Sequence, residues 1–289
     1  MARNIGMRIP RTIMEKGIAY VAQFASSTGL DVLDVGALNP EVKQQMDRFN
    51  LKVGSVDAQG VGSLLSSDGQ KRAAASASIR QQITQIAALG AKTMFMCLVP
   101  EDRTMARKDT FAIWKEVFPE VVAHAEAHDV SICIEGWPGP APTFPTIGCT
   151  PEMWRAMFEA VPSKHFGLNY DPSHLVWLGV DYMRVLNEFG DRIVHAHGKD
   201  TAFLSEERYE SGILPPTFGT KYAYSGGSWR YTIPGDGEVN WRQVADKLDQ
   251  LGYKGPICIE LEDNTYHGSL EKEQQGIQQA YAYLAKIFK

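Results

Sequence analysis

The tetrapeptide Ile132-Cys133-Ile134-Glu135 recurs in the chain as Ile257-Cys258-Ile259-Glu260. Both copies are short apolar runs rich in β-branched residues, which is typical of a buried strand, and both end in a carboxylate. Similar runs occur along the whole sequence. Eight of them predict strands: Ile5–Ile9, Val32–Val35, Lys52–Val56, Thr93–Val99, Ser131–Glu135, Phe166–Tyr170, Ile193–His197 and Ile257–Leu261.

The segments between these strands repeat their apolar residues with a period of about 3.6, which predicts helices. Thr150 followed by Pro151 is a typical helix start, and Gly90 and Gly252 each end a helix just before a strand. The pattern is weaker in the short unit Asn39–Asn50. The predicted helices are Met14–Ser27, Gln70–Leu89, Phe111–His128, Pro151–Ala160, Trp241–Leu251 and Leu270–Phe288.

Strands that alternate with helices predict the α/β class and a parallel sheet, and eight such units close a (β/α)₈ TIM barrel. The chain of 289 residues is ordinary for one barrel, and no shift in composition suggests a second domain. An open doubly wound sheet would require a glycine-rich phosphate loop after an early strand, which the sequence lacks. We therefore expect a single barrel domain over residues 1–289, with a long loop at Thr201–Asn240.

Composition excludes some classes of partner. The net charge of −5 and the lack of a Lys/Arg run argue against nucleic acid, and no apolar run approaches the length of a membrane span. Residues 1–20 carry no apolar region behind a basic start, so we expect no signal peptide. Cys97, Cys133, Cys149 and Cys258 form no Cys-x-x-Cys pair, which favours buried thiols in a reducing cytoplasm.

Polar residues end four successive predicted strands. In a TIM barrel the carboxyl ends of the strands meet at one mouth, where the catalytic groups lie. Three carboxylates and one imidazole would repel each other there unless a cation joined them. This donor set suits Mn²⁺ best, with Mg²⁺, Co²⁺, Fe²⁺ or Zn²⁺ as alternatives. The predicted ligands of one divalent metal are Glu135, Asp171, His197 and Glu260.

The alternation of strand side chains places Cys133 and Cys258 on the same faces as the glutamates that follow them. Both cysteines are therefore expected to fill the inside of the barrel beneath Glu135 and Glu260. A single glutamate at such a position could equally form a salt bridge at the rim. The metal prediction rests on four strand ends together rather than on either glutamate alone.

The seventh strand continues into Lys199-Asp200 and has two histidines on one face. His197 lies nearer the strand end and is the predicted ligand. His195 is either a group behind the site that assists substrate binding or an ordinary core histidine. Lys199 either binds a substrate hydroxyl or oxyanion or is a solvated loop lysine.

Further candidates surround the proposed mouth. His174 follows Asp171 by three residues and is placed to hydrogen-bond a substrate carbonyl or hydroxyl. Trp137 and the run Trp229-Arg230-Tyr231 are candidates for an aromatic wall, because sugars stack their apolar C–H faces on such rings. Ordinary core packing is the alternative for each aromatic residue.

At these residues the sequence resembles the xylose isomerase-like barrel superfamily over essentially its whole length. This group includes ketose 3-epimerases, inosose isomerases and dehydratases, and catalytic subunits of C-glycoside deglycosidases. The most specific parts of the resemblance are the ordered motifs Ile-Glu135, Asp171-x-x-His174, His195-x-His197 and Ile-Glu260.

The resemblance implies a metal-dependent reaction next to a carbonyl. In the ketose epimerases the matching Glu, Asp, His and Glu bind the metal, and the two glutamates exchange protons with the substrate. Carried over, Glu135 and Glu260 are both ligands and an acid/base pair, and the metal stabilises an enediolate. Return of the proton to the opposite face gives epimerisation, return to the neighbouring carbon gives isomerisation, and loss of a β-substituent gives elimination.

Two departures from the ketose epimerase pattern put a free ketohexose in doubt. Gly198-Lys199-Asp200 stands where those enzymes carry an acidic residue and then an arginine, and it is closer to the inosose type. The segment Thr201–Asn240 is an insertion without a clear counterpart. We expect this loop to cover the mouth through Trp229, Arg230 and Tyr231, or to pack against a neighbouring subunit.

Four functional hypotheses remain. The first is an isomerase or epimerase of a sugar or cyclic polyol, and the second is a lyase on a keto-sugar or 3-oxo-glycoside. Phosphodiester hydrolysis would need several zinc ions, more histidines and a basic surface. A non-catalytic sugar-binding barrel would not need paired carboxylates on a metal. The resemblance implies a homo-oligomer, or a hetero-oligomer for a deglycosidase subunit.

Overall fold

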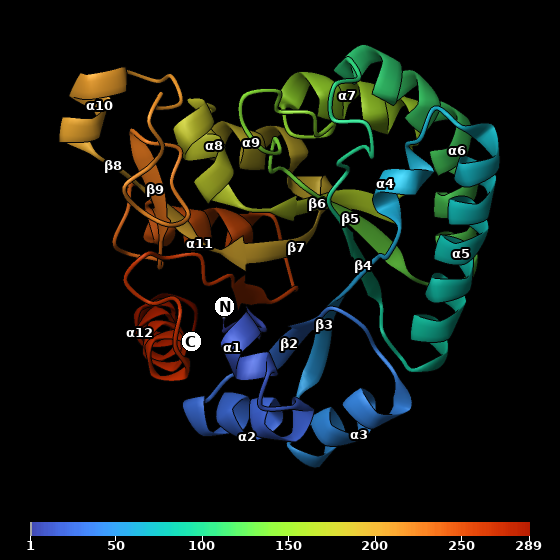
Figure 1. The fold of residues 1–289 in the computed structure, drawn as a ribbon. Coiled ribbons are helices and arrows are strands. Elements are labelled where there is room, and N and C mark those ends of the chain that lie inside the picture. Colours follow the sequence, from blue (N-terminus) through green and yellow to red (C-terminus); the bar gives the residue numbers. More distant parts are fainter. Residues whose placement is uncertain (1) are drawn as a thin grey trace.

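The predicted (β/α)₈ barrel is confirmed by the structure, a computed structural model that describes residues 2–289. Parallel strands close into a barrel in the order β1-β10-β7-β6-β5-β4-β3-β2. Figure 1 shows the helices around this barrel. The barrel strands are β1 (Ile5–Arg8), β2 (Val32–Val35), β3 (Lys52–Asp57), β4 (Thr93–Met96), β5 (Ser131–Glu135), β6 (Phe166–Tyr170), β7 (Ile193–Gly198) and β10 (Ile257–Ile259).

The helices follow the predicted pattern with one break. The predicted helix Met14–Ser27 is divided into α1 and α2, because Gly17 takes a φ of 87° that a helix cannot hold. The helices are α1 (Arg11–Met14), α2 (Ile18–Thr28), α3 (Pro40–Arg48), α4 (Val61–Leu64), α5 (Gly69–Ala88), α6 (Arg107–Ala127), α7 (Pro151–Ala160), α8 (Pro172–Leu178), α9 (Tyr182–Phe189), α10 (Ser205–Ser211), α11 (Trp241–Gln250) and α12 (Leu270–Phe288), with a 3₁₀ turn at Gly190–Arg192.

Local sequence explains where several helices start and stop. The Thr150 hydroxyl accepts a hydrogen bond from the Met153 N–H at the start of α7. Gly90 and Gly252 lie just beyond α5 and α11 with positive φ, so both predicted helix ends are confirmed. Asp171 caps α8 by accepting from the Ser173 N–H, so one predicted metal ligand also starts a helix.

Aromatic side chains join the outer face of the barrel to α6. Trp114 and Phe118 of α6 are fully buried, with ring centroids 4.7 Å apart, and Phe118 meets Phe166 of β6 at 5.1 Å. Inside the barrel, Cys133 and Cys258 are completely buried, as predicted. The outer face of β5 and β6 thus packs against α6, and their inner face packs in the barrel interior. Packing on both faces fixes the position of their carboxyl ends at the mouth.

The segment after β7 is more ordered than the predicted loop Thr201–Asn240. It contains β8 (Asp200–Phe203), α10 and β9 (Trp229–Thr232), and the two strands pair antiparallel. We call residues 200–240 the excursion, and Figure 1 shows it beside α8. The prediction of a long loop did not anticipate these two strands, because each is short and stable only through its partner.

Asp200 anchors this excursion to the barrel. Its carboxylate is completely buried and accepts hydrogen bonds from the N–H groups of Thr201, Gly235 and Val239 and from the indole of Trp241. Burial raises the pKa of Asp200 to about 6, although these donors act in the opposite direction. Since Asp200 follows Lys199 directly, the anchor also fixes the backbone next to the mouth.

Three predicted strands end earlier in the structure. β1 ends at Arg8 instead of Ile9, and β4 ends at Met96 instead of Val99. β10 ends at Ile259 instead of Leu261, so Glu260 lies just beyond its strand. Within residues 2–289, no helix has both the length and the apolar character needed to cross a membrane.

Candidate active site

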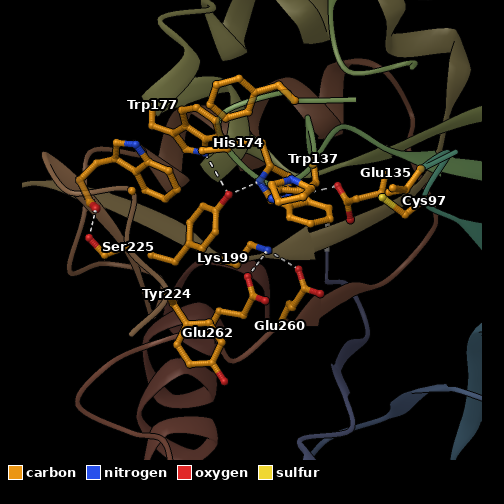
Figure 2. Close-up of a pocket in the computed structure, with 18 of the residues that line it drawn as sticks. Cys97, Glu135, Trp137, His174, Trp177, Lys199, Tyr224, Ser225, Glu260 and Glu262 are labelled. Carbon is orange, nitrogen blue, oxygen red and sulfur yellow. Dashed lines mark hydrogen bonds and ion pairs between the residues drawn. The ribbon is translucent and has the colours of Figure 1, made fainter. Parts of the chain in front are cut away.

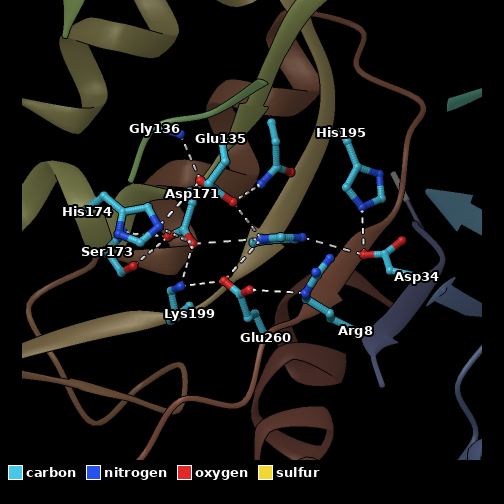
Figure 3. A network of polar contacts seen from close by, with 12 residues as sticks. Arg8, Asp34, Glu135, Gly136, Asp171, Ser173, His174, His195, Lys199 and Glu260 are labelled. Carbon is cyan, nitrogen blue, oxygen red and sulfur yellow. Dashed lines mark hydrogen bonds and ion pairs between the residues drawn. The ribbon is translucent and has the colours of Figure 1, made fainter. Parts of the chain in front are cut away.

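The structure brings the four predicted metal ligands together at the carboxyl ends of β5, β6, β7 and β10. One donor atom from each of Glu135, Asp171, His197 and Glu260 lies within 4.8 Å of the others. Figure 3 shows Glu135, Asp171 and Glu260 converging from separate elements. The closed barrel explains this convergence, because residues far apart in the chain end their strands around one mouth.

The donor atoms in this cluster fit a divalent cation. Nδ1 of His197 lies 3.2 Å from Glu135 Oε2, 3.3 Å from Glu260 Oε2 and 3.8 Å from Asp171 Oδ2. Among residues 2–289, both ring nitrogens of His197 and Oδ2 of Asp171 are buried without a hydrogen-bond partner. Buried polar atoms normally have partners. Three carboxylates and one imidazole can supply the oxygen and nitrogen ligands of such an ion.

Asp34 lies on the opposite side of the His197 ring. Its Oδ2 is 3.6 Å from His197 Nε2 and 2.9 Å from His195 Nε2, and its Oδ1 accepts from the Ser55 N–H at 2.7 Å. Gly54 leaves room for this carboxylate, since a Cβ there would lie 2.2 Å from Oδ1. A carboxylate behind a ligating imidazole orients the ring, and this arrangement turns Nδ1 of His197 toward the three other carboxylates.

The interpretation of Lys199 as a solvated loop lysine was wrong. Its side chain is 2% exposed, and Nζ donates to Glu260 Oε2 and, at 3.0 Å, to Glu262 Oε2. Nζ also lies 3.3 Å from Asp171 Oδ2. Burial alone would lower the pKa of Lys199, but these carboxylates raise it well above its usual value. The positively charged ammonium group of Lys199 is therefore buried at the mouth of the barrel.

Glu135 and Glu260 are held by different partners. Glu135 accepts hydrogen bonds from the Gly136 N–H at 2.9 Å and the Asn169 amide at 2.8 Å. Glu260 contacts Lys199 and lies 3.4 Å from Nε of Arg8. Burial would raise the pKa of each glutamate, but His174 and His197 beside Glu135, and Lys199 and His197 beside Glu260, hold both well below the usual range.

His174 is held by Tyr231 of β9 and, through it, by Trp177 of its own helix α8. Its Nδ1 lies 2.6 Å from the Tyr231 hydroxyl, which accepts a hydrogen bond from the Trp177 indole at 2.9 Å. This leaves the Tyr231 proton for His174 Nδ1, so Nε2 carries the imidazole proton. Nε2 points into the site, 3.4 Å from both Glu135 Oε1 and Asp171 Oδ2.

A cavity of about 460 Å³ opens above these residues (Figure 2). Of the predicted substrate contacts, Trp137, Lys199 and Trp229 line it, as does the predicted catalytic His174. His195 lies behind His197 on Asp34, and Arg230 pairs with Asp263 at 3.2 Å; neither lines the cavity.

Sequence reasoning missed several residues of the site. Asp34 interrupts the apolar strand Val32–Val35, and this unusual polar residue was the available signal. Glu262 lies two residues after Glu260, a spacing that would place both on one side of an extended chain. Arg8, which pairs with Asp57 at 2.6 Å and reaches Glu260, follows the apolar part of its strand in the same way.

A family model described as xylose isomerase-like TIM barrel matches residues 12–287. The chain belongs to this family. An inosose dehydratase of Lactiplantibacillus plantarum is 38% identical over 101 residues, which cover 35% of this chain and 32% of that protein. The match thus spans about a third of this curated relative.

Solved structures share the fold over nearly the whole chain. A D-psicose 3-epimerase from Clostridium cellulolyticum H10, crystallised with D-tagatose, has a TM-score of 0.73 at 14% identity and covers 99% of both chains. The IolI protein with a bound zinc atom has a TM-score of 0.71 at 16% identity and covers 99% of this chain and 98% of its own. At these identities the likeness concerns the fold.

Proposed function

We propose that the protein is a divalent-metal-dependent isomerase or epimerase that removes the proton α to a carbonyl in a sugar or cyclic polyol. The observation that carries this proposal is the pair Glu135 and Glu260. Their carboxylates both lie beside the same atom of His197, 3.2 and 3.3 Å from its Nδ1. Two carboxylates at one centre can remove a proton and return one.

A cation held by Glu135, Asp171, His197 and Glu260 would act as a Lewis acid on the substrate carbonyl, and Mn²⁺ is the ion we expect first. One glutamate takes the α-proton while the C–H electron pair moves toward the carbonyl oxygen. The ammonium of Lys199 lies beside Glu260 and stabilises negative charge on substrate oxygens. His174 directs its Nε2 proton into the site and binds a substrate hydroxyl or carbonyl.

A lyase reaction is the second candidate, and the unequal partners of the two glutamates favour it. Elimination needs one base and one proton donor for the leaving group. Glu135 beside neutral donors and Glu260 beside Lys199 are suited to such different roles. The partial similarity to inosose dehydratases agrees with dehydration or cleavage of a keto-sugar or 3-oxo-glycoside.

Proton exchange tests the step that both reactions share. Metal-loaded protein is incubated in deuterated water with ketohexoses, inososes and 3-oxo-glycosides, and deuterium at the α-carbon is followed by NMR. We expect metal-dependent exchange with at least one substrate, followed by epimer, isomer or elimination product. No exchange with any of these classes at full metal occupancy would refute the proposal.

The proposed setting is that of a small-molecule enzyme. The substrate is a sugar or cyclic polyol, and the protein works in the cytoplasm as a homo-oligomer, or as a hetero-oligomer if it is a deglycosidase subunit. Trp229 and Tyr231 belong to a cover over the mouth, since both line the cavity from β9.

A further inference from the structure

The cavity has a second part, made almost entirely of aromatic and aliphatic side chains. We call this part the outer chamber, and it is formed by Phe144, Trp177, Ile213, Tyr224 and Trp229. Most of the charged residues that line the cavity lie at or next to strand ends in the other, inner part, and Glu262, which pairs with Lys199, lies at the border beside Tyr224. Figure 2 shows Trp177, Tyr224 and Ser225 on the side away from Glu135 and Cys97.

Tyr231 separates the two parts. Nζ of Lys199 lies 4.6 Å from the centre of its ring, and its hydroxyl contacts His174, so one side of Tyr231 belongs to the inner part. The indole of Trp177 reaches the same hydroxyl from the outer chamber. The ring of Trp229 is stacked on Trp177 at 4.4 Å and 9°, which forms an aromatic wall beyond Tyr231.

The outer chamber offers few polar groups to a ligand. The Trp177 N–H is already bonded to Tyr231, and the Ser225 hydroxyl donates to the Trp229 carbonyl at 2.7 Å, so the Trp229 N–H and the Tyr224 hydroxyl are the polar groups left for a ligand. A second sugar ring could stack a C–H face on these rings, but it would lose water from several hydroxyls and gain few partners, which is costly. An aromatic ring has no such cost and packs well against tryptophan edges and faces.

Ile213 shows that the outer chamber is not closed by the protein itself. This side chain lines the cavity and is nevertheless 86% exposed. An apolar group bound in the chamber would cover Ile213 and remove its surface from water. A free monosaccharide bound at the carboxylates presents its hydroxyl-rich edges and would leave this surface wet.

From these contacts we infer that the substrate is a sugar or cyclic polyol that carries an aromatic substituent. The sugar ring lies at Glu135, Glu260 and Lys199, and the aromatic group lies in the outer chamber against Trp177 and Trp229. This inference rests on the proposed function for the position of the sugar ring. It adds that the enzyme prefers aryl-substituted substrates to free sugars.

Matched ligand pairs test the preference by calorimetric titration of metal-loaded full-length protein. The pairs are phenyl and methyl glycosides of glucose, galactose and xylose, and cellobiose represents a second sugar ring. We expect the phenyl member to bind about tenfold tighter or more, which corresponds to about 1.4 kcal/mol. Equal affinities in every pair, including no binding by either member, or tighter binding of cellobiose than of phenyl glucoside, would overturn the inference.

Variants locate the effect in the outer chamber. Trp229→Ala and Ile213→Glu should reduce the phenyl preference to less than about threefold, since each removes apolar contact. If Trp229→Ala disturbs β9, Ile213→Glu still tests the chamber, because Ile213 is mostly exposed and its replacement should not affect folding. Phe218→Ser is the control: Phe218 is fully exposed on the same excursion and does not line the cavity. An unchanged preference in Ile213→Glu and Trp229→Ala overturns the assignment.

The outcome is independent of the exchange assay. Proton exchange with inososes but no preference for phenyl glycosides would refute only the proposed aromatic substituent and leave the proposed reaction in place. The wild type could instead prefer phenyl glycosides, lose this preference in Ile213→Glu, and exchange no proton with any substrate class. That result would refute the proposed reaction and leave the outer chamber as a binding site.

Discussion

The two copies of Ile-Cys-Ile-Glu have the same sequence and end in different surroundings. Glu135 is the last residue of β5, is 5% exposed at its side chain, and is held by a backbone N–H and an amide. Glu260 lies beyond β10, is 16% exposed, and is held by Lys199 and Arg8. Identical local sequence therefore produces one carboxylate held by a backbone N–H and an amide and one held between the cations Lys199 and Arg8.

The difference comes from neighbouring strands rather than from the tetrapeptides. β5 pairs with β6, whose register places Asn169 beside Glu135. β10 pairs with β7 and β1, which deliver Lys199 and Arg8 next to Glu260. Two carboxylates with separate partners can take separate roles, as a base and as a group paired with a proton or charge donor.

The strongest test of this comparison removes one carboxylate at a time. Glu135→Gln and Glu260→Gln should each lower substrate turnover by more than about 100-fold, because each loses a base and a metal ligand. Steady-state rates and α-proton exchange are measured at saturating Mn²⁺. Glu238→Gln, at an exposed position, is the control.

The exchange data then separate the two proposed reactions. Loss of exchange in both variants supports two bases and epimerisation or isomerisation. Loss in only one variant indicates a single base, as elimination requires. Near-normal turnover in either variant would contradict the assignment of the pair.

A second test acts on His197, which lies at nearly equal distances from both glutamates. His197→Ala and Asp171→Asn should lose most of the bound metal. Asp34→Asn should weaken metal affinity by about 10–100-fold, since Asp34 orients the His197 ring from behind. Affinity is measured by competition with a fluorescent chelator, and Asp246→Asn, exposed on α11, is the control.

An unchanged metal affinity in Asp34→Asn would show that barrel packing alone orients His197. Unchanged metal content in both His197→Ala and Asp171→Asn would remove the metal assignment itself. The two results concern different residues, so one can fail without the other.

A third test affects only the Glu260 side. Lys199→Met should lower the free energy of unfolding by roughly 3–5 kcal/mol in the presence of EDTA, because Asp171, Glu260 and Glu262 lose a buried cation. Mn²⁺ should restore much of this loss by supplying positive charge and binding the folded state. Urea unfolding with EDTA or Mn²⁺ measures both effects.

Lys108→Met, at an exposed position in α6, is the matched control and should unfold as the wild type does. A loss in Lys199→Met that Mn²⁺ does not reduce would mean that Lys199 stabilises the fold independently of the carboxylate cluster.

The sequence was sufficient to predict the barrel and the meeting of four polar side chains at its mouth, for a shared physical reason. Each of the four side chains stands at or just beyond the carboxyl end of a strand, and barrel closure brings those ends together. Glu135, Asp171 and His197 could therefore be named without coordinates. Glu260 was named as well, although its strand ends two residues earlier than expected.

Contacts that depend on strand register could not be predicted in this way. Asn169 reaches Glu135 across the paired strands β5 and β6, whereas Asp34 of β2 reaches His197 of β7 across the inside of the barrel. The sequence does not specify which residues meet in either way. The burial of Lys199 depends on carboxylates that belong to a different strand. The Asp200 carboxylate, at the start of β8, likewise accepts three of its four hydrogen bonds from residues between Gly235 and Trp241, which lie far along the chain.

The smallest test affects only the Glu135 side. Asn169→Leu keeps the approximate size of the side chain and removes the amide that donates to Glu135 Oε2 at 2.8 Å. One neutral hydrogen bond contributes about 0.5–1.5 kcal/mol, so kcat/KM should fall by roughly 2- to 10-fold. The Gly136 N–H still holds Oε1, which limits the loss. Asn187→Leu, exposed on α9, is the control. A loss as large as that of Glu135→Gln would mean that Asn169 itself binds the substrate, and no loss would mean that Gly136 and the metal are enough to position Glu135.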